Sequence, residues 1–383
     1  MNYLTVIDRC YGPNVSRPFL FSGCDEVFRV HLLQYIIQTA AQEKKALVIL
    51  DNGDLLRLPA LEAAGYRIVN GLGGEFALCD PFRVDTLQGM LRFRNLLGAL
   101  GYSEVQKQSL VQYLDFLSYV ERLDKPEGKS HITLELFGRY STAAQTEDRL
   151  LQLRQQGIIS GQQQIHLLSK YAELSADAAD FEKVLYLLLL FVRGEPLALD
   201  TEGLAVVYPL KALDEDSVFC SLLTCLLSWG LGACSRDKVA VVILDRGSGS
   251  RSYLTDFVGH LPDVERHLLS EDIFTLCNGM ALTSLKNQFA VKVYSRHRDM
   301  ESCAAVEKSL GSVQVVKQSR AVQYDRRWRA NSPWDVLLGN NRTDITTTNA
   351  PVWESRYPKE IIHSLNMGSA ILETGGNITI VTI

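Results

Sequence analysis

The sequence predicts an α/β fold in which a mostly parallel sheet is interrupted by an all-helical insert. Short apolar runs that do not alternate with polar residues, such as Ala46 to Leu50 and Val239 to Leu244, are typical of strands buried on both faces. Helical patterns separate these runs, and that order is typical of parallel strands joined by helical crossovers. Between Thr86 and Arg193 the strand signals stop and helical segments follow one another.

The first part of the sheet is expected in residues 1–85. An apolar run there ends at Ser22 and Gly23 and is followed by residues with helical spacing, which indicates a strand, a turn and a helix. A second apolar run ends at an acidic residue, Asp51. The expected elements are strands over 19–21, 46–50 and 66–69 and helices over 25–41 and 55–64.

The all-helical insert is expected over residues 86–199. Glycines and a Pro-Glu-Gly sequence separate its helical segments, and the apolar positions recur at the spacing of a helical-bundle core. We assign no chemistry to this region.

The second part of the sheet is expected in residues 200–383. Strands are predicted over 204–208, 239–244, 273–276, 289–294 and 313–316, and helices over 214–231 and 299–310. A basic, aromatic stretch (320–334) and a polar loop (340–349) follow. Two short strands, 369–372 and 377–381, are expected to close the chain as a hairpin around Gly375 and Gly376.

Composition limits the classes of function. The formal net charge of −5 argues against a protein whose whole surface attracts nucleic acid. The eight cysteines lack any C-x-x-C pair, which favours reduced thiols in a reducing compartment, so we expect a cytoplasmic protein. The longest apolar run, Val184 to Val192, is far shorter than a membrane helix, and the first residues lack the pattern of a signal peptide.

The strand over 239–244 ends at Asp245, which is followed by Arg246 and a Gly-Ser-Gly sequence. Ligands and metal ions bind at the carboxyl ends of strands in open α/β sheets. In P-loop ATPases this corner carries an Asp for Mg²⁺ and a Glu that prepares the attacking water, but here Arg246 takes the place of the Glu. The simpler alternative is that Asp245 and Asp51 cap neighbouring turns.

Four stretches carry a resemblance to a known family. In chain order they are ALVILDNGDLLRLPALEAAGYRIV (Ala46 to Val69), VILDRG (Val242 to Gly247), FAVKVYSRHRDMESCAAVEKSLG (Phe289 to Gly311) and PVWESRYPKEIIHSLNMGSAIL (Pro351 to Leu372). Together they resemble the type IV secretion coupling proteins, the P-loop ATPases of conjugative DNA transfer. The resemblance implies a RecA-like P-loop NTPase core with an inserted all-α domain. Members of that family normally begin with membrane helices, which this sequence lacks, so direct insertion in the membrane is not expected.

Against the pattern of that family, residues 23–30 take the place of the phosphate-binding loop. The loop works through glycines that let backbone N–H groups face the phosphates, a Lys and a Ser or Thr. Of these only Gly23 is present: Phe28 replaces the second glycine, Arg29 the lysine and Val30 the hydroxyl residue, while Asp25 adds negative charge beside Glu26. The degenerate remnants of the nucleotide site are therefore Gly23, Arg29, Val30, Asp245 and Arg246.

The resemblance with these losses predicts a catalytically inactive relative that acts as a binding or scaffold subunit of a conjugative or type IV secretion system. We assign no catalytic residue, no metal site and no cofactor. The alternatives are an active DNA-translocating ATPase with a divergent P-loop, which would use ATP and Mg²⁺, and a stand-alone protein-interaction module.

A basic, aromatic segment is the predicted binding surface. Residues 286–329 contain ten Lys and Arg against four acidic residues, a net charge of +6. Aromatic residues between arginines suit a protein hot spot or stacking on bases, and a solvated face is the plain alternative. Because the whole chain is acidic, we expect the partners to be protein components of a secretion or conjugation apparatus, with nucleic acid as the alternative. Those partners could recruit the protein to the inner face of the membrane. The surface comprises Arg320, Tyr324, Arg326, Arg327, Trp328, Arg329 and Trp334.

Overall fold

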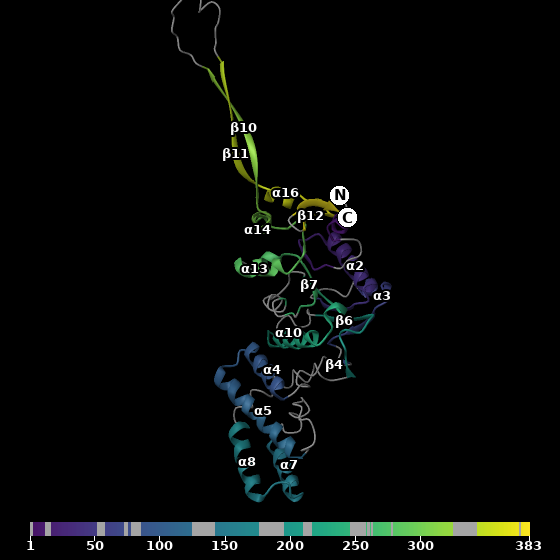
Figure 1. The fold of residues 1–383 in the computed structure, drawn as a ribbon, viewed down its shortest axis with the longest axis vertical. Coiled ribbons are helices and arrows are strands. Elements are labelled where there is room, and N and C mark those ends of the chain that lie inside the picture. Colours follow the sequence, from purple (N-terminus) through teal and green to yellow (C-terminus); the bar gives the residue numbers. More distant parts are fainter. Residues whose placement is uncertain are drawn as a thin grey trace, which may run out of the picture. The chain divides into compact units, whose positions relative to one another are not determined.

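The computed structural model describes residues 3–11, 17–51, 58–72, 76–77, 86–124, 142–175, 195–209, 217–245, 258, 261, 263–276, 279–324, 343–374 and 377–383. Contacts divide the chain into two compact units. Unit 1 comprises Met1–Ser295 and Met367–Ile383, and unit 2 comprises Arg296–Asn366 (Figure 1).

Unit 1 is built on a nine-stranded sheet with the order β13-β12-β9-β1-β8-β7-β2-β6-β3. The strands from β9 to β3 pair in parallel, and the closing pair β12 and β13 adds antiparallel to β9. The strands are β1 (Phe19–Ser22), β2 (Ala46–Asp51), β3 (Arg67–Asn70), β6 (Leu204–Pro209), β7 (Val239–Asp245), β8 (Glu265–Ser270), β9 (Val291–Tyr294), β12 (Ser369–Thr374) and β13 (Asn377–Thr382).

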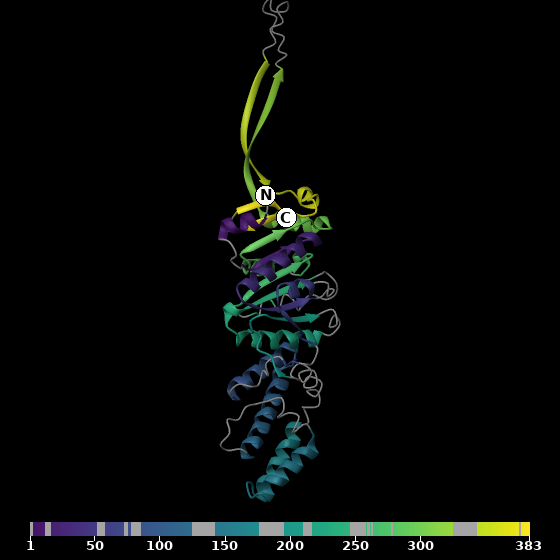
Figure 2. The same ribbon diagram turned by 90° about the vertical axis from the view of Figure 1, so that its right-hand side faces the viewer.

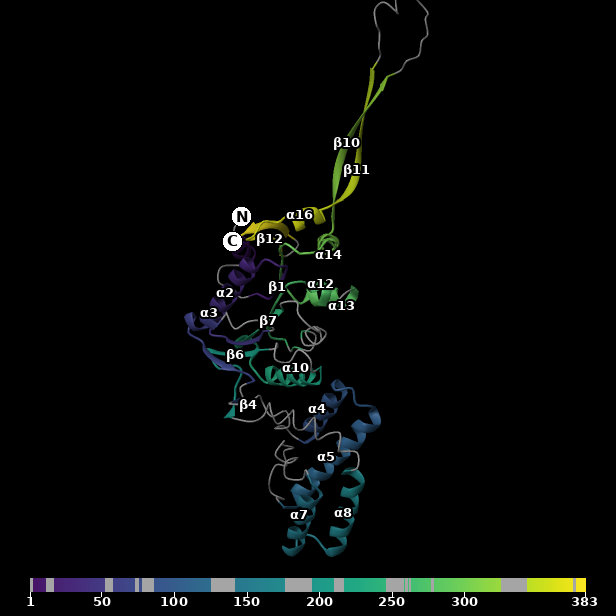
Figure 3. The same ribbon diagram turned by 180° about the vertical axis from the view of Figure 1, so that it is seen from behind.

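Helices lie on both faces of this sheet. Helices α2 (Glu26–Gln42) and α3 (Leu58–Ala63) lie on one face, and α12 (Ile273–Leu276) and α13 (Gly279–Asn287) lie on the other (Figures 1 and 3). The first face packs on α2 and α1 (Tyr3–Tyr11) in one continuous hydrophobic core. This layering explains why the central strands are apolar on both faces rather than alternating.

The described residues between two further short strands are helical. Strand β4 (Phe76–Ala77) pairs in parallel with β5 (Glu195–Pro196). The helices between them are α4 (Thr86–Ala99), α5 (Glu104–Asp124), α7 (Ala143–Gln155) and α8 (Gly161–Ser175). Helix α10 (Ser217–Gly232) and the short η2 (Arg236–Lys238) then lead from β6 into β7. None of the helices within the described ranges is long and apolar enough to cross a bilayer.

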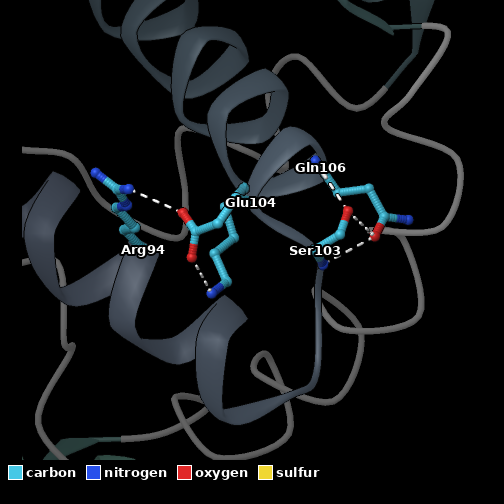
Figure 4. Close-up of polar contacts among 5 residues, drawn as sticks. Arg94, Ser103, Glu104 and Gln106 are labelled. Atoms are coloured by element: carbon cyan, nitrogen blue, oxygen red, sulfur yellow. Dashed lines mark hydrogen bonds and ion pairs between the residues drawn. The ribbon is translucent and has the colours of Figure 1, made fainter.

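The turn between α4 and α5 is held by polar contacts of its own residues. The Ser103 hydroxyl accepts a hydrogen bond from Gln106 N (3.4 Å), and the Gln106 side chain accepts one from Ser103 N (3.1 Å), so the start of α5 carries a capping box (Figure 4). Glu104 lies between Lys107 (2.8 Å) and Arg94 of α4 (2.9 Å). Hydrogen bonds from Lys107 and then Arg94 lower the pKa of the Glu104 carboxyl.

Unit 2 joins two helices to a long antiparallel hairpin. Its helices are α14 (Met300–Leu310) and α16 (Lys359–His363), and its strands are β10 (Ser312–Tyr324) and β11 (Thr343–Ser355). The strands pair from Ser312 with Ser355 to Tyr324 with Thr343, and Figure 2 shows them coiling around each other. At the base, the Glu307 carboxylate accepts hydrogen bonds from the Ser355 hydroxyl and from Lys359 N (3.2 Å).

The structure confirms most of the predicted elements of unit 1, including the strands over 19–21, 46–50, 204–208, 239–244 and the closing pair, each within a few residues. The strand predicted over 273–276 is wrong, because those residues form α12. The strand at this position in the sheet is β8, Glu265–Ser270. The first half of β8 carries charged residues, among them Glu265. Lys45 forms ion pairs with Glu265 and with Glu43, and this pairing lowers the cost of burying the Glu265 carboxylate.

The polar loop predicted over 340–349 is also wrong in large part, since β11 begins at Thr343. The threonines of this stretch are β-branched and suit a strand once an antiparallel partner is present. That partner is β10, which extends the strand predicted over 313–316 as far as Tyr324. A polar sequence can therefore form a strand when its backbone pairs along its whole length.

Replacing Asp299, the N-cap of α14, tests the start of that helix. The Asp299 carboxylate accepts a hydrogen bond from Ser302 N (2.7 Å), and this bond is the main cause that lowers the pKa of the Asp299 carboxyl. We expect Asp299→Ala to weaken the helix by about 1 kcal/mol, seen as roughly fivefold faster amide hydrogen exchange in Met300–Leu310.

Because the pKa of Asp299 is lowered in the folded state, its stabilisation is fully present above the ordinary carboxyl pKa and is lost as the pH falls through the lowered value. The difference between wild type and Asp299→Ala should therefore shrink in acid. Asp299→Asn, which retains a capping oxygen that does not titrate, is the control and should remove that pH dependence. Equal exchange in wild type and Asp299→Ala at neutral pH would contradict the assignment.

Candidate functional site

The candidate site lies where the carboxyl ends of neighbouring parallel strands meet. In the registers of the sheet, Ser270 at the end of β8 stands beside Ser22 of β1 on one side and Asp245 of β7 on the other. These three residues are fully buried. Gly23, directly after β1, and Asp245, at the end of β7, are thus brought to the same carboxyl edge of the sheet, with β8 between their strands.

Asp245 lies at the predicted strand end, and its carboxylate takes part in a hydrogen bond inside the protein. Ser270 donates its hydroxyl to Asp245 Oδ2 at 2.6 Å, and the same hydroxyl oxygen accepts from Asp272 N at 3.1 Å. The Asp245 carbonyl accepts from Glu271 N at 3.1 Å. These contacts tie the end of β7 to the turn after β8, a structural role of the kind expected for a capping Asp.

Gly23 makes the turn between β1 and α2. Its φ of +146° lies in a region that side chains rarely adopt, so glycine is required there. Its N–H donates to the Ser270 carbonyl at 3.1 Å, and the preceding Ser22 hydroxyl accepts from Ile273 N at 3.2 Å. The Gly23 N–H group is therefore hydrogen-bonded to the end of β8.

Asp25 is the N-cap of α2. Its Oδ1 accepts from Phe28 N at 3.0 Å, and its Oδ2 accepts from Gly368 N at 2.6 Å. Gly368, at φ +76°, lies just before β12, and its carbonyl accepts from Ile383 N at 3.0 Å. The Asp25 side chain is 5 % exposed, so a buried carboxylate meets the positive end of the helix and binds the carboxyl-terminal segment to it.

Arg29, which is predicted to stand in the place of the P-loop lysine, is 4 % exposed and lies among carboxylates. Its Nη2 forms an ion pair with Glu26, one turn earlier on α2, and its Nη1 lies 3.8 Å from Glu271 after β8. A guanidinium in this setting balances the charge of the protein's own anions.

The two other positions that depart from the phosphate-loop pattern belong to the body of α2. Phe28 is fully buried, with its ring 5.1 Å from that of Tyr3 and 6.1 Å from that of Phe21. Val30 is half-buried and carries no group that could ligate a cation. The place of the second glycine is therefore part of the hydrophobic core.

Among the described residues named above, carboxylates outnumber basic side chains at this edge. They comprise one guanidinium, that of Arg29, and five carboxylates: Asp25, Glu26, Asp245, Glu271 and Asp272. A phosphate cradle, in contrast, needs N–H donors and basic side chains. Within the described residues, no three His, Cys, Asp or Glu side chains are arranged as a metal site.

The remaining predicted site residues lie elsewhere. Arg246 and the segment with Arg326, Arg327, Trp328, Arg329 and Trp334 fall outside the described residues. Arg320 and Tyr324 belong to β10 of unit 2. Their contribution to a binding surface stays a prediction.

Ser270 and Gly368 were not predicted as site residues, yet both make hydrogen bonds at this carboxyl edge of the sheet. Ser270 was missed because β8 was not predicted, although a Ser directly after the apolar pair Leu268 and Leu269 was a usable signal. Gly368 lies 343 residues from Asp25 in the chain, so no local pattern could indicate this contact.

Comparison with known proteins gives a fold and no closer relation. No protein-family model matches the sequence, and no curated protein matches it. Among solved structures, VirB4 of Thermoanaerobacter pseudethanolicus superposes with a TM-score of 0.52 at 11 % identity, covering 96 % of this chain and 88 % of that one. The bacterial conjugative coupling protein TrwB, in its trigonal form in complex with sulphate, gives 0.51 at 14 % identity, covering 96 % and 85 %. The fold is thus that of these RecA-like P-loop proteins, as the sequence predicted.

Replacing Asp25 tests the contacts at this edge. Asp25→Ala removes the acceptor for two buried N–H groups, so we expect the free energy of unfolding to fall by about 2–4 kcal/mol. Asp25→Ser keeps an acceptor for Phe28 N but is too short to reach Gly368 N, and it should lose less. Chemical denaturation followed by tryptophan fluorescence measures the difference, and equal stability of wild type and Asp25→Ala would refute the role of this carboxylate.

Proposed function

We propose that this protein is a catalytically inactive relative of the coupling ATPases and acts as a binding or scaffold subunit of a conjugative or type IV secretion system. The fold shared with TrwB and VirB4 supports the relation. The observation that carries the proposal is the use of Asp25, at the amino terminus of α2, as the acceptor for the helix's own Phe28 N and for Gly368 N.

A carboxylate at that place competes with phosphate in two ways. It accepts an N–H group of the first helical turn, which a phosphate oxygen would need, and its negative charge opposes an incoming anion at close range. In this chain the anion at the amino terminus of α2 is the Asp25 carboxylate.

The second corner supports the same proposal. Asp245 is fully buried and accepts from the Ser270 hydroxyl, which leaves it poorly placed to ligate a Mg²⁺ ion together with a nucleotide. The following residue is Arg246, so the sequence offers no carboxylate beside Asp245 to position a water molecule. Loss of one such group typically lowers the rate by about 10² to 10⁴.

A working DNA-translocating ATPase with a divergent loop is the rival function. It would need Asp25 and Arg29 to rearrange, because both lie buried in contacts with the protein's own groups. Nucleotide would then have to break these contacts on binding, which should cost affinity. The two functions therefore differ in a measurable way.

Nucleotide binding and turnover separate the two functions. We expect isothermal titration with Mg-ATP to give no heat of micromolar binding, and a phosphate-release assay to give no turnover above buffer, with or without DNA. Asp245→Asn, which keeps the shape of the side chain, should behave as wild type. Micromolar binding together with DNA-stimulated turnover that Asp245→Asn abolishes would overturn the proposal.

We further propose that the segment from Arg320 to Trp334 binds a protein component of the apparatus. Arginines beside aromatic residues are enriched in protein hot spots, and the net charge of −5 disfavours contact with DNA outside this segment. Arg320 and Tyr324 lie in the second half of strand β10, which ends at Tyr324, shortly before Arg326, Arg327 and Trp328 in the sequence.

Two sets of variants distinguish a protein partner from nucleic acid in a pull-down with purified components of the apparatus. For a protein partner, Trp328→Ala should weaken binding by about 2 kcal/mol or more, with a modest response to salt. For duplex DNA, Arg326→Ala with Arg327→Ala should have the larger effect, and affinity should fall with salt with a slope near −0.9 per phosphate contact. Unchanged binding by all variants would identify the segment as a solvated face.

A further inference from the structure

Strand β13 forms one edge of the nine-stranded sheet. It pairs with β12 on its inner side, and no strand within the described residues pairs with its outer side. An edge strand presents a row of backbone N–H and C=O groups, with which another extended segment can pair. The six residue pairs between β12 and β13, from Ser369 with Thr382 to Thr374 with Asn377, follow one another without a bulge. The outer edge of β13 is therefore a regular template for a further strand.

Strand β13 lacks the features that commonly protect an edge strand from such pairing. It contains no charged residue and no proline, and five of its six residues are β-branched. The other edge strands of more than two residues in the described part of the chain differ: β3 begins with Arg67, β10 contains Lys317, and β11 contains Pro351. Among these edges, β13 is the most open to the addition of a strand.

An apolar row on one face of the sheet ends at this edge. Tyr294 of β9 stands beside Ile371 of β12, and Ile371 stands beside Ile380 of β13. The side chains of Tyr294 and Ile371 are fully buried, whereas Ile380 is 40 % exposed. An apolar residue beyond Ile380 in the same row would continue this contact and cover Ile380.

The opposite face of β13 belongs to the hydrophobic core. Val381 is fully buried in the core that packs on α1 and α2, and it stands beside Ala370 of β12. Thr379 lies on this same face, because side chains alternate along a strand. A strand that pairs with β13 therefore needs β-branched or apolar residues on both of its faces and no charge.

A second copy of β13 has these properties. When two copies run antiparallel about a twofold axis at Ile380, Ile380 stands opposite Ile380 of the other copy. In the same register Thr379 stands opposite Val381, and Ile378 stands opposite Thr382. Opposite residues of an antiparallel pair lie on the same face, so the core face of one copy continues into that of the other. Each of these pairs joins two β-branched side chains, so β13 is complementary to itself on both faces.

We propose that two copies of this chain associate through β13, which pairs antiparallel with β13 of the second copy around Ile380. The contact uses the same strand on both copies and closes on itself, so a dimer forms and the edge is removed. The self-complementarity of the strand is what assigns the occupant to a second copy. The proposal depends neither on nucleotide binding nor on a place in a secretion system.

The variant Ile380→Lys tests the centre of this contact. In the dimer it places two ammonium groups opposite each other, and like charges directly opposite destabilise an antiparallel pair. We expect sedimentation equilibrium of the full chain to show a wild-type dimer that dissociates in the micromolar range, with a dissociation constant raised about tenfold or more in the variant. Ile380 is partly exposed, so the substitution should leave the monomer folded, and circular dichroism checks this.

A charge exchange shows whether the two strands meet at this residue. Ile380→Glu alone should also weaken the dimer, but an equimolar mixture of the Ile380→Lys and Ile380→Glu proteins should associate, because opposite charges then face each other. A damaged fold would not recover on mixing. Leu151→Lys is the matched control: Leu151 is 42 % exposed on α7, and this variant should dimerise as the wild type does.

Hydrogen exchange of the wild type gives a second measurement that needs no variant. The amides of Asn377–Thr382 should exchange more slowly at the protein concentrations at which the dimer forms.

Three results would overturn the proposal. A wild-type protein that stays monomeric at every concentration would show that a second copy does not occupy this edge. A dimer that Ile380→Lys leaves unchanged, or that Leu151→Lys weakens equally, would lie at another surface. A wild-type dimer together with a mixture of the two charged variants that stays monomeric would exclude the pairing around Ile380.

Discussion

The carboxylate of Asp25 is the contact on which the carboxyl edge of the sheet depends. A buried backbone N–H group needs an acceptor, and Asp25 supplies one to Phe28 at the start of α2 and one to Gly368 before β12. One side chain thereby joins the first turn of α2 to the segment before the last two strands of the sheet. The cost of burying the charge is offset by these two bonds and by the positive end of the helix.

That arrangement is chemically the same as the binding of an anion at a helix amino terminus, with the anion built into the chain. The neighbouring side chains are also used inside the protein. Phe28 adds its ring to the hydrophobic core, and Arg29 balances Glu26 and Glu271. The faces of the sheet are covered by α1, α2 and the helices opposite, so the protein's own side chains supply the packing of the sheet.

Sequence reasoning located this edge but not the contacts within it. The strands ending at Ser22 and Asp245 were predicted because they are apolar throughout, and the negative charge at Asp25 was visible in the sequence. Strand β8 was missed, since its charged first half hides the period of a strand. Without β8, Ser270 could not be recognised as the residue between the two predicted corners.

The sequence by itself determined the fold class and most of the strands and helices along the chain, because these follow from local patterns of a few residues. The tertiary structure alone decided which strands are neighbours, that Gly368 lies on Asp25, and that threonine-rich residues from Thr343 pair with β10. The physical reason is distance along the chain: backbone donors and acceptors are satisfied by whichever segment the fold brings within reach, and a local pattern does not identify that segment.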